Sequence, residues 1–417
     1  MRLPAHREEP SVRYVAASLV AGVFFGGVAG GVAFPTLPRL GPLLGISPFL
    51  VGVILSVNRF TRLLLNTPAG SILDRMGTRR PMIGGFLVMS LAPFGYVVGM
   101  HPEAVPGSAA GIFLVSRAAW GVGSAFVFVG AFSTITHVTT TDNRGKWIGY
   151  MRGGQTMGFP TGLVVGGVVA DAAGITEAFV LAGAAGMLST LVAAAVLPNL
   201  AAEVNRTAPL RELPALVSRD RRVLAVGTVN LVVRFLFAGV LLSTVVLYAD
   251  RNAIAIGGLS ESGVSGVVMA VSVVASSVTT VVAGRISDSL PNRALVPVPA
   301  LASLAVGFAA VATVPTLVGT LVGVSLIGVG VGGTNPPLLA YLGDISPAED
   351  VGKLGGAYNV FGDVGSTAGP LIALPVAYRI GFGTQYLLCA VLVVLTGVLV
   401  ASTLVGASPE PNPQLAD

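Results

Sequence analysis

Charged residues are scarce in this chain of 417 amino acids. Only 10% of them are Asp, Glu, Lys or Arg, against roughly 25% in a soluble domain. Hydrophobic residues make up 53% of the chain, and its mean hydropathy is +0.84. This balance excludes a soluble globular protein. The net charge of +5 does not indicate a nucleic-acid partner, because the basic residues lie in short segments between apolar runs, as membrane topology requires.

Cysteine and histidine are almost missing. The single cysteine, Cys389, lies in the last apolar run, which excludes an internal disulfide framework and a cysteine-based metal site. The three histidines, His6, His101 and His137, lack ligand spacing such as i, i+4. The chain has no G-x-x-x-x-G-K-[ST] loop, so nucleotide-driven pumping by this chain alone is unsupported. We expect no cofactor and no bound metal.

Long apolar runs are what the sequence has instead. A membrane-spanning helix needs about 20 mostly apolar residues, because every backbone N–H and C=O must be satisfied within the segment. Twelve runs in the sequence reach this length. They predict an all-α membrane protein with twelve transmembrane helices. The runs are residues 14–37, 48–73, 81–100, 109–138, 147–170, 177–198, 223–248, 262–286, 294–312, 315–341, 353–377 and 384–406.

The distribution of basic residues predicts the orientation. With a cytoplasmic N-terminus, 16 of the 24 Lys and Arg residues fall in inner segments, and only Arg39, Arg251 and Arg379 fall in outer ones. We therefore expect a multi-pass protein of the cell membrane with both termini in the cytoplasm. The longest polar stretch, 199–222, is the expected cytoplasmic linker between two six-helix bundles, 1–198 and 223–417.

The two halves repeat each other. Gly70-Ser-Ile-Leu-Asp74 recurs as Gly284-Arg-Ile-Ser-Asp288, 214 residues later. A second set of residues recurs 207 residues later: Gly121, Gly123, Gly145, Lys146, Gly149, Gly158 and Gly162 reappear as Gly328, Gly330, Gly352, Lys353, Gly356, Gly365 and Gly369. Repeated halves with a binding site between them are a transporter architecture, so we expect two pseudo-symmetric bundles.

The loop after the second run carries a diagnostic motif. It reads Gly70-Ser-Ile-Leu-Asp74-Arg75-Met-Gly77-Thr-Arg79-Arg80 and resembles the signature loop of the major facilitator superfamily. The resemblance implies that this cluster latches the two halves in one conformation. The alternative is that its arginines only anchor the topology. In the second half Pro291 replaces the glycine and Arg293 matches Arg79, so that copy is degenerate.

Two further motifs resemble the same family. Leu114-Val-Ser-Arg117-Ala-Ala-Trp-Gly121-Val-Gly123 is similar to its motif with a membrane-embedded arginine. Gly154-Gln-Thr-Met-Gly158-Phe-Pro160-Thr-Gly162 resembles the glycine-proline motif of the drug:proton antiporter branch, with the proline displaced by one position. The literal pattern occurs in the eleventh run, as Gly365-Ser-Thr-Ala-Gly369-Pro370. The resemblance implies proton-coupled efflux by alternating access.

Polar side chains inside the runs are costly in lipid and are therefore candidates for function. Asn58, Arg62 and Asn66 follow one another at helical spacing, with Arg59 beside them, and form one polar stripe. The predicted substrate-binding residues are Asn58, Arg59, Arg62, Asn66, Arg117, Asn230, Arg234 and Asn359. The alternative is a purely structural hydrogen-bonded network.

Asp363 is the only acidic residue well inside a predicted span. We predict that it is the proton-coupling carboxylate, and the alternative is a fixed ion pair with Arg234. The arginines within spans outnumber this one acid, which favours an anionic or zwitterionic substrate over a simple lipophilic cation.

The sequence thus predicts a secondary active transporter of a small molecule, with protons and the lipid bilayer as partners, and a monomer. Three alternatives stay open. One is an uptake carrier or uniporter for an anionic or zwitterionic metabolite, and another is a membrane sensor that does not transport. The third is a membrane enzyme, but the sequence shows no cluster of nucleophile, base or metal ligands at the membrane face, so we expect that the protein is not an enzyme.

Overall fold

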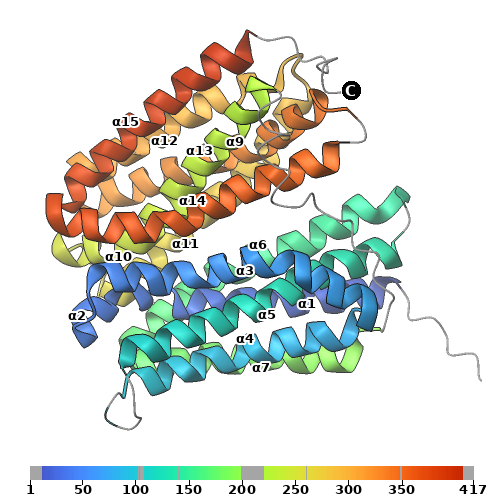
Figure 1. The fold of residues 1–417 in the computed structure, drawn as a ribbon. Coiled ribbons are helices and arrows are strands. Elements are labelled where there is room, and N and C mark those ends of the chain that lie inside the picture. Colours follow the sequence, from blue (N-terminus) through green and yellow to red (C-terminus); the bar gives the residue numbers. More distant parts are fainter. Residues whose placement is uncertain are drawn as a thin grey trace, which may run out of the picture.

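Nearly all of the chain is helical in the computed structural model (Figure 1). The structure describes residues 12–101, 103, 108–139, 141–198, 220–259, 261–347 and 350–406. Within these ranges the only β pairing is an isolated bridge between Ile256 and Leu259. The all-α prediction is therefore confirmed.

The helices of the first half are α1 (Val12–Ala33), η1 (Leu37–Arg39), α2 (Leu40–Leu44), α3 (Pro48–Met76), α4 (Arg79–Gly99), α5 (Ala109–Val138), α6 (Thr141–Ala172) and α7 (Ile175–Val196). Those of the second half are α9 (Arg221–Arg234), η3 (Phe235–Leu241), α10 (Leu242–Arg251), α11 (Glu261–Asp288), η4 (Arg293–Leu295), α12 (Pro297–Thr313), α13 (Leu317–Asp344), α14 (Val351–Ile380), α15 (Phe382–Val400) and η5 (Ala401–Val405). The segments η3 and η5 are π-helices, and η1 and η4 are 3₁₀-helices.

Each predicted apolar run corresponds to a long helical segment. Among the described residues, eleven segments are long and apolar enough to cross a membrane; α9, η3 and α10 together form one of them. The remaining run, 147–170, lies in α6, which is 32 residues long but more polar. The helix α9 begins at Arg221, so the last two residues of the predicted 199–222 linker are helical. Residues 199–219 of that linker lie outside the described residues.

Local sequence signals explain where α3 begins and ends. Pro48 occupies its first turn, and the Ser47 hydroxyl accepts a hydrogen bond from the Leu50 N–H at 3.4 Å. Both are standard features of a helix start. The helix ends at Gly77, whose φ of +76° favours glycine because a side chain is strained there. The presence of Gly77 in the predicted latch loop is thus explained by the backbone conformation that ends α3.

Glycine stripes allow the helices within each half to approach closely. On α6, four glycines at every fourth position face carbonyl oxygens of α1; the pairs are Gly154 with Val20, Gly158 with Phe24, Gly162 with Val28, and Gly166 with Val32. In the second half, Gly365 faces the Leu231 carbonyl and Gly369 faces that of Phe235. These partners are again 207 residues from their counterparts, so the sequence repeat corresponds to repeated helix packing.

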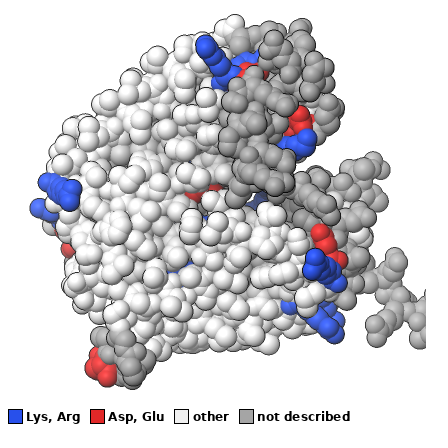
Figure 2. Space-filling model, in the orientation of Figure 1, with Lys and Arg blue, Asp and Glu red and all other residues white. Residues whose placement is uncertain are grey.

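The charged residues lie mainly at the two ends of the helices. Figure 2 shows a broad face without charge between them, and a few acidic and basic atoms in the seam between the halves. At one end Arg79 donates to the Ala194 carbonyl at 2.9 Å, and Asn292 donates to the carbonyls of Leu404 and Val405 at 3.2 and 3.0 Å. We call this end of the molecule the linker side. The helices α3, α7, α11 and η5 have their C-terminal ends there.

The two halves are in close contact on the side opposite the linker side. There Gly52 approaches Pro370, and Gly167 approaches Gly263 and Gly266. Arg39 also donates from Nη1 to the Ser262 hydroxyl at 2.6 Å. These contacts join α3 to α14 and α6 to α11, and toward the linker side the two groups of helices diverge (Figure 1). We call these contacts the closed seam.

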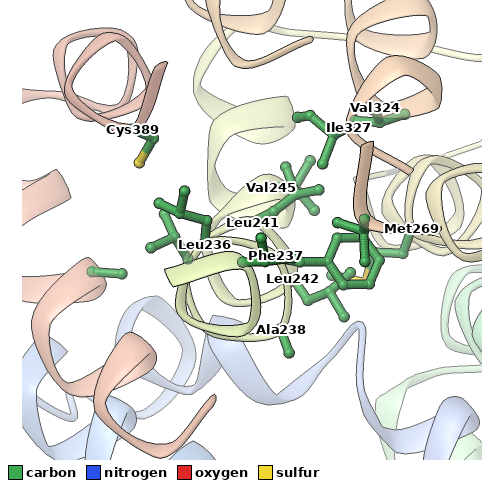
Figure 3. Close-up of a cluster of buried hydrophobic side chains, with 14 of the residues drawn as sticks. Leu236, Phe237, Ala238, Leu241, Leu242, Val245, Met269, Val324, Ile327 and Cys389 are labelled. Atoms are coloured by element: carbon green, nitrogen blue, oxygen red, sulfur yellow. The ribbon is translucent and has the colours of Figure 1, made fainter. Parts of the chain in front are cut away.

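The core of the second half surrounds the π-helix η3. Figure 3 shows Phe237 beside Met269 of α11, and Val245 facing Val324 and Ile327 of α13. Cys389 of α15 lies at the edge of this apolar cluster and is buried. Ala238 lies on the side of η3 that faces the blue ribbon of the first half, which places η3 at the boundary between the halves.

Candidate functional site

A cavity of about 180 Å³ lies within the first half, between α1, α3, α4, α5 and α6. Small residues of α1 leave room for it on one side, and polar residues of α3 border it on another. Its lining residues are Val23, Gly26, Gly27, Gly30, Phe34, Asn58, Arg59, Arg62, Phe86, Met89, Arg117, Trp120, Ser124, Val127, Phe128, Gln155 and Phe159.

All the charged residues of the described lining are cationic. Arg59, Arg62 and Arg117 border the cavity, and no Asp or Glu is among the described lining residues. The Oδ1 atom of Asn58 is buried and has no hydrogen-bond partner among the described residues. A buried polar group without a partner is costly, so the Asn58 side chain destabilises the helix packing beside the cavity.

Five aromatic side chains form part of the remaining wall. Phe34 and Phe159 contact each other edge to face, with their ring centroids 5.8 Å apart. The Arg62 guanidinium lies 5.5 Å from the centroid of the Phe128 ring, which is a cation–π distance. Phe86 and Trp120 complete the aromatic wall. The cavity therefore combines a flat apolar surface with positive charge.

Arg62 forms an ion pair that joins the two halves. Its Nη2 lies 2.9 Å from Oδ1 of Asp363 on α14, and both side chains are partly buried. The predicted alternative partner, Arg234, is instead exposed on α9. The ion-pair prediction was wrong in this respect, because α3 packs directly on α14 and places Arg62 opposite Asp363.

Arg59 also reaches across the boundary, to the main chain of the second half. Its Nη1 donates to the carbonyls of Ala238 and Ser366 at 3.2 and 3.1 Å. Ser366 precedes Pro370 by four residues, and proline has no N–H to offer that carbonyl. The Leu242 N–H, which a regular α-helix directs to the Ala238 carbonyl, bonds to the carbonyls of Phe237 and Val240 instead.

The proline and the π-helix thus free two backbone carbonyls, and one guanidinium nitrogen binds both. A buried carbonyl without a donor is costly, so Arg59 satisfies acceptors that the helices of the second half have left open. In this conformation Arg59 connects the halves at the depth of the cavity.

Arg117 contributes to helix packing as well as to the cavity. It is 4% exposed, and its Nε and Nη2 donate to the carbonyls of Ile54 and Leu55 on α3, both at 3.4 Å. These bonds fix α5 against α3. The membrane-embedded arginine of the sequence motif therefore positions the helix that carries Asn58, Arg59 and Arg62.

The structure brings only part of the predicted set together. Asn58, Arg59, Arg62 and Arg117 line the cavity, whereas the other four predicted residues do not. Asn230 is buried and donates to the Tyr358 carbonyl at 2.6 Å, in the packing of α9 on α14. Arg234 and Asn359 are exposed, and Asn66 is partly buried on α3.

The predicted latch lies on the linker side. Gly70 is buried, and Asp74, Arg75 and Arg80 are exposed. Arg79 contacts α7 of its own half through Ala194. In the second half, Arg293 of the degenerate copy forms two ion pairs. Its Nη1 lies 2.5 Å from Oδ1 of Asp288, and its Nε lies 2.9 Å from Oδ2 of Asp344. The latch role of the first copy stays a prediction.

Sequence reasoning missed the aromatic wall. Aromatic residues in an apolar run face lipid, a helix neighbour or a cavity, and composition does not separate these cases. A signal was present in Trp120, which follows Arg117 by three residues and therefore shares its helix face.

Two repeated bundles of long apolar helices, with a cationic cavity beside their boundary, define a polytopic membrane protein of the two-bundle transporter fold. The chain belongs to the Major Facilitator Superfamily, whose family profile matches residues 19–370 and, in a second match, residues 255–416. The resemblance carried by the sequence motifs is thus confirmed.

Curated relatives match part of the chain. Multidrug resistance protein 2 of Bacillus subtilis (strain 168) is 26% identical over 179 residues, which is 43% of this chain and 42% of that protein. Quinolone resistance protein NorA of Staphylococcus aureus (strain MRSA252) is 24% identical over 162 residues, or 39% of each. The chain therefore spans about two fifths of the length of these relatives.

Solved structures match nearly the whole fold. A bacterial homologue of the human lysosomal transporter Spinster, in an inward-facing and occupied conformation, superposes with a TM-score of 0.78 and 16% identity, covering 97% of this chain and 100% of that one. A D-xylose–proton symporter gives a TM-score of 0.74 and 15% identity with the same coverage. At such identities the similarity shows the fold.

Proposed function

We propose that this protein is a secondary active transporter that carries a small molecule across the cell membrane by alternating access. The moving units are the two halves, 1–198 and 223–417, and the 199–222 linker and both termini face the cytoplasm. The Arg62–Asp363 ion pair is the observation that carries the proposal. It joins the halves beside the cavity, so one electrostatic contact links the occupancy of the cavity to the arrangement of the halves.

Asp363 is the proposed proton-coupling group. A protonated carboxyl has no charge with which to hold Arg62, so protonation weakens this contact between the halves. The closed seam and the Arg59 bonds then remain as the contacts that favour the present conformation. A proton on Asp363 thereby changes both the balance between conformations and the charge available to a ligand.

The direction of transport has two candidates. Efflux in exchange for protons is favoured by the glycine-proline motifs and by relatives whose names refer to drug resistance. Uptake of an anionic or zwitterionic metabolite is favoured by the arginines of the cavity, which lack an acidic partner within the described lining.

Proteoliposomes with purified protein test the coupling role of Asp363. The probes are two permanently charged molecules that cross lipid poorly, the organic anion naphthalene-2-sulfonate and the organic cation 2-naphthyltrimethylammonium. We expect the wild type to accumulate one of them under an imposed pH difference. Asp363→Asn should still exchange that probe across the membrane but should lose its pH-driven accumulation by about tenfold or more.

Asp344→Asn is the matched control, because it removes one carboxylate that pairs with Arg293 away from the cavity. It should accumulate the probe like the wild type. Wild-type accumulation by Asp363→Asn would remove Asp363 from the coupling role. Binding of a probe without any flux in the wild type would indicate a sensor rather than a carrier.

A further inference from the structure

We infer that the cavity binds a small aromatic organic anion, and that the anionic group of this ligand competes with Asp363 for Arg62. The inference names a substrate class for the proposed transporter. It rests on the proposed function for its consequence on direction, while the binding claim stands on the site itself.

The charge of the site is the first reason. Three arginines border the cavity and Asp363 is the one acid in contact with them among the described residues. Positive charges therefore exceed negative ones by two in a weakly solvated region, where an unbalanced charge is expensive. A carboxylate or sulfonate bound there reduces this excess, whereas a cation increases it.

The free hydrogen-bonding capacity of the arginines is the second reason. Among the described residues, Asp363 engages one guanidinium nitrogen of Arg62, and the two carbonyls engage one nitrogen of Arg59. The remaining guanidinium nitrogens of both residues have no partner there. Guanidinium groups bind carboxylates in a bidentate manner, so a ligand carboxylate that engages two nitrogens of Arg62 would displace the single contact with Asp363.

Size and surface restrict the rest of the ligand. At about 180 Å³ the cavity is smaller than the roughly 300–1,000 Å³ of sites for drug-sized molecules. Five aromatic side chains line it: Phe34, Phe86, Trp120, Phe128 and Phe159. Such walls favour a flat ring system by offset or edge-to-face contact. The ligand is therefore compact, with an aromatic or similarly flat body and one acidic group.

Aromatic walls also bind cations, so a cationic ligand is the alternative to an anion. A bound cation needs a nearby negative charge or a ring face that is free of competing cations. Here the Phe128 face is already occupied by Arg62, and Asp363 is held by the same arginine. A cationic ligand on any other ring of the wall would add its charge to those of Arg59, Arg62 and Arg117, which line the same cavity.

The competition at Arg62 determines how protons and ligand are linked. Protonation of Asp363 releases Arg62 for the ligand, and by reciprocity a ligand anion on Arg62 favours the protonated form of Asp363. Proton and anion thus bind together and cross the membrane in the same direction. A cation would instead compete with the proton and be exchanged for it. The sign of the ligand's charge therefore decides between the two proposed directions.

The surroundings of Asp363 are consistent with this linkage. Arg62 of α3 is in direct contact with Asp363, and Arg59 of α3 lies within electrostatic reach of Asp363, of Arg117 on α5 and of Arg234 on α9. Tyr358 of α14 donates its hydroxyl hydrogen to Asn335 on α13. Among the described residues Asp363 is the one acid of this group, so it supplies the one negative charge that opposes these arginines.

Equilibrium binding to the purified full-length protein in detergent tests the inference without any gradient. The probes are 2-naphthoate, the neutral 2-naphthamide and the cation 2-naphthyltrimethylammonium, measured by calorimetry at two pH values. We expect the wild type to prefer 2-naphthoate and to bind it more tightly at the lower pH. Asp363→Asn should bind 2-naphthoate about tenfold more tightly than the wild type at the higher pH, without pH dependence.

Two further variants complete the test. Asp344→Asn should bind 2-naphthoate like the wild type, and Arg62→Gln should weaken it about tenfold or more. Preference for the cation, equal affinity of the wild type and Asp363→Asn for 2-naphthoate, or no binding of 2-naphthoate would each overturn the inference. If these binding results hold while pH-driven accumulation fails, the substrate class stands and the proposed transport coupling falls.

Discussion

Gly162→Leu is expected to prevent assembly of the first half. A side chain at this position would point into α1, where its Cβ would lie 2.9 Å from Cα of Gly31 and from the carbonyl carbon of Val28. These are backbone atoms that cannot rotate away. The loss of folding free energy should therefore be at least as large as the upper part of the ~1–3 kcal/mol range for overpacked side chains. Loss of the monodisperse peak in size-exclusion chromatography of the solubilised protein measures it.

Gly153→Leu is the matched control for this prediction. It introduces the same side chain on the same helix, but a Cβ at Gly153 meets no atom within 4 Å. This variant should behave like the wild type in chromatography and in thermal unfolding. Equal behaviour of Gly162→Leu and Gly153→Leu would contradict the close packing of α1 on α6.

Gly167→Leu is expected to leave the fold intact and to hold the two halves apart at the closed seam. Its Cβ would lie 2.6 Å from the Ser262 carbonyl oxygen and 3.2 Å from Cα of Gly266. Here the opposing helix belongs to the other half, so the halves can separate without unpacking either bundle. A transporter that cannot close this side loses turnover, and we expect transport to fall by about tenfold or more.

Labelling measures the effect of this wedge. In a Cys389→Ser background, a cysteine introduced at Phe34, which is buried beside the cavity, should react faster with a membrane-impermeant maleimide from the side opposite the linker. Gly153→Leu again serves as the control, with wild-type labelling. Unchanged labelling in Gly167→Leu would show that the seam does not close the cavity on that side.

Hydropathy and motif patterns were sufficient for the fold. The apolar runs correspond to the helices within a few residues, since length and hydrophobicity are what a membrane-spanning helix requires. The repeat of glycines at a separation of 207 residues was informative for a physical reason. The paired glycines Gly158 and Gly365, and Gly162 and Gly369, occupy equivalent backbone contacts in the two halves.

Contacts between distant segments could not be predicted in the same way. A polar stripe shows which face of α3 is buried, but not which helix lies opposite, so the alternative of a fixed ion pair named Arg234 as the partner of Asp363 instead of Arg62. The acceptors of Arg59 were equally hidden. They exist because Pro370 and the π-helix η3 each free a carbonyl, and a π-helix has no clear sequence pattern.

The central claim is that the two halves open alternately on the two sides of the membrane under the control of Asp363. Two distances between the halves, one on each side, test this claim. Spin labels at Leu43 and Ile380 report on the closed seam, and labels at Met76 and Val351 report on the linker side; all four positions are exposed. Pulsed electron paramagnetic resonance in Cys389→Ser protein, at two pH values, should show reciprocal changes, with one distance shortening as the other lengthens. In Asp363→Asn the two populations should no longer depend on pH. Distances that stay constant in every sample, or that lengthen together, would contradict alternating access.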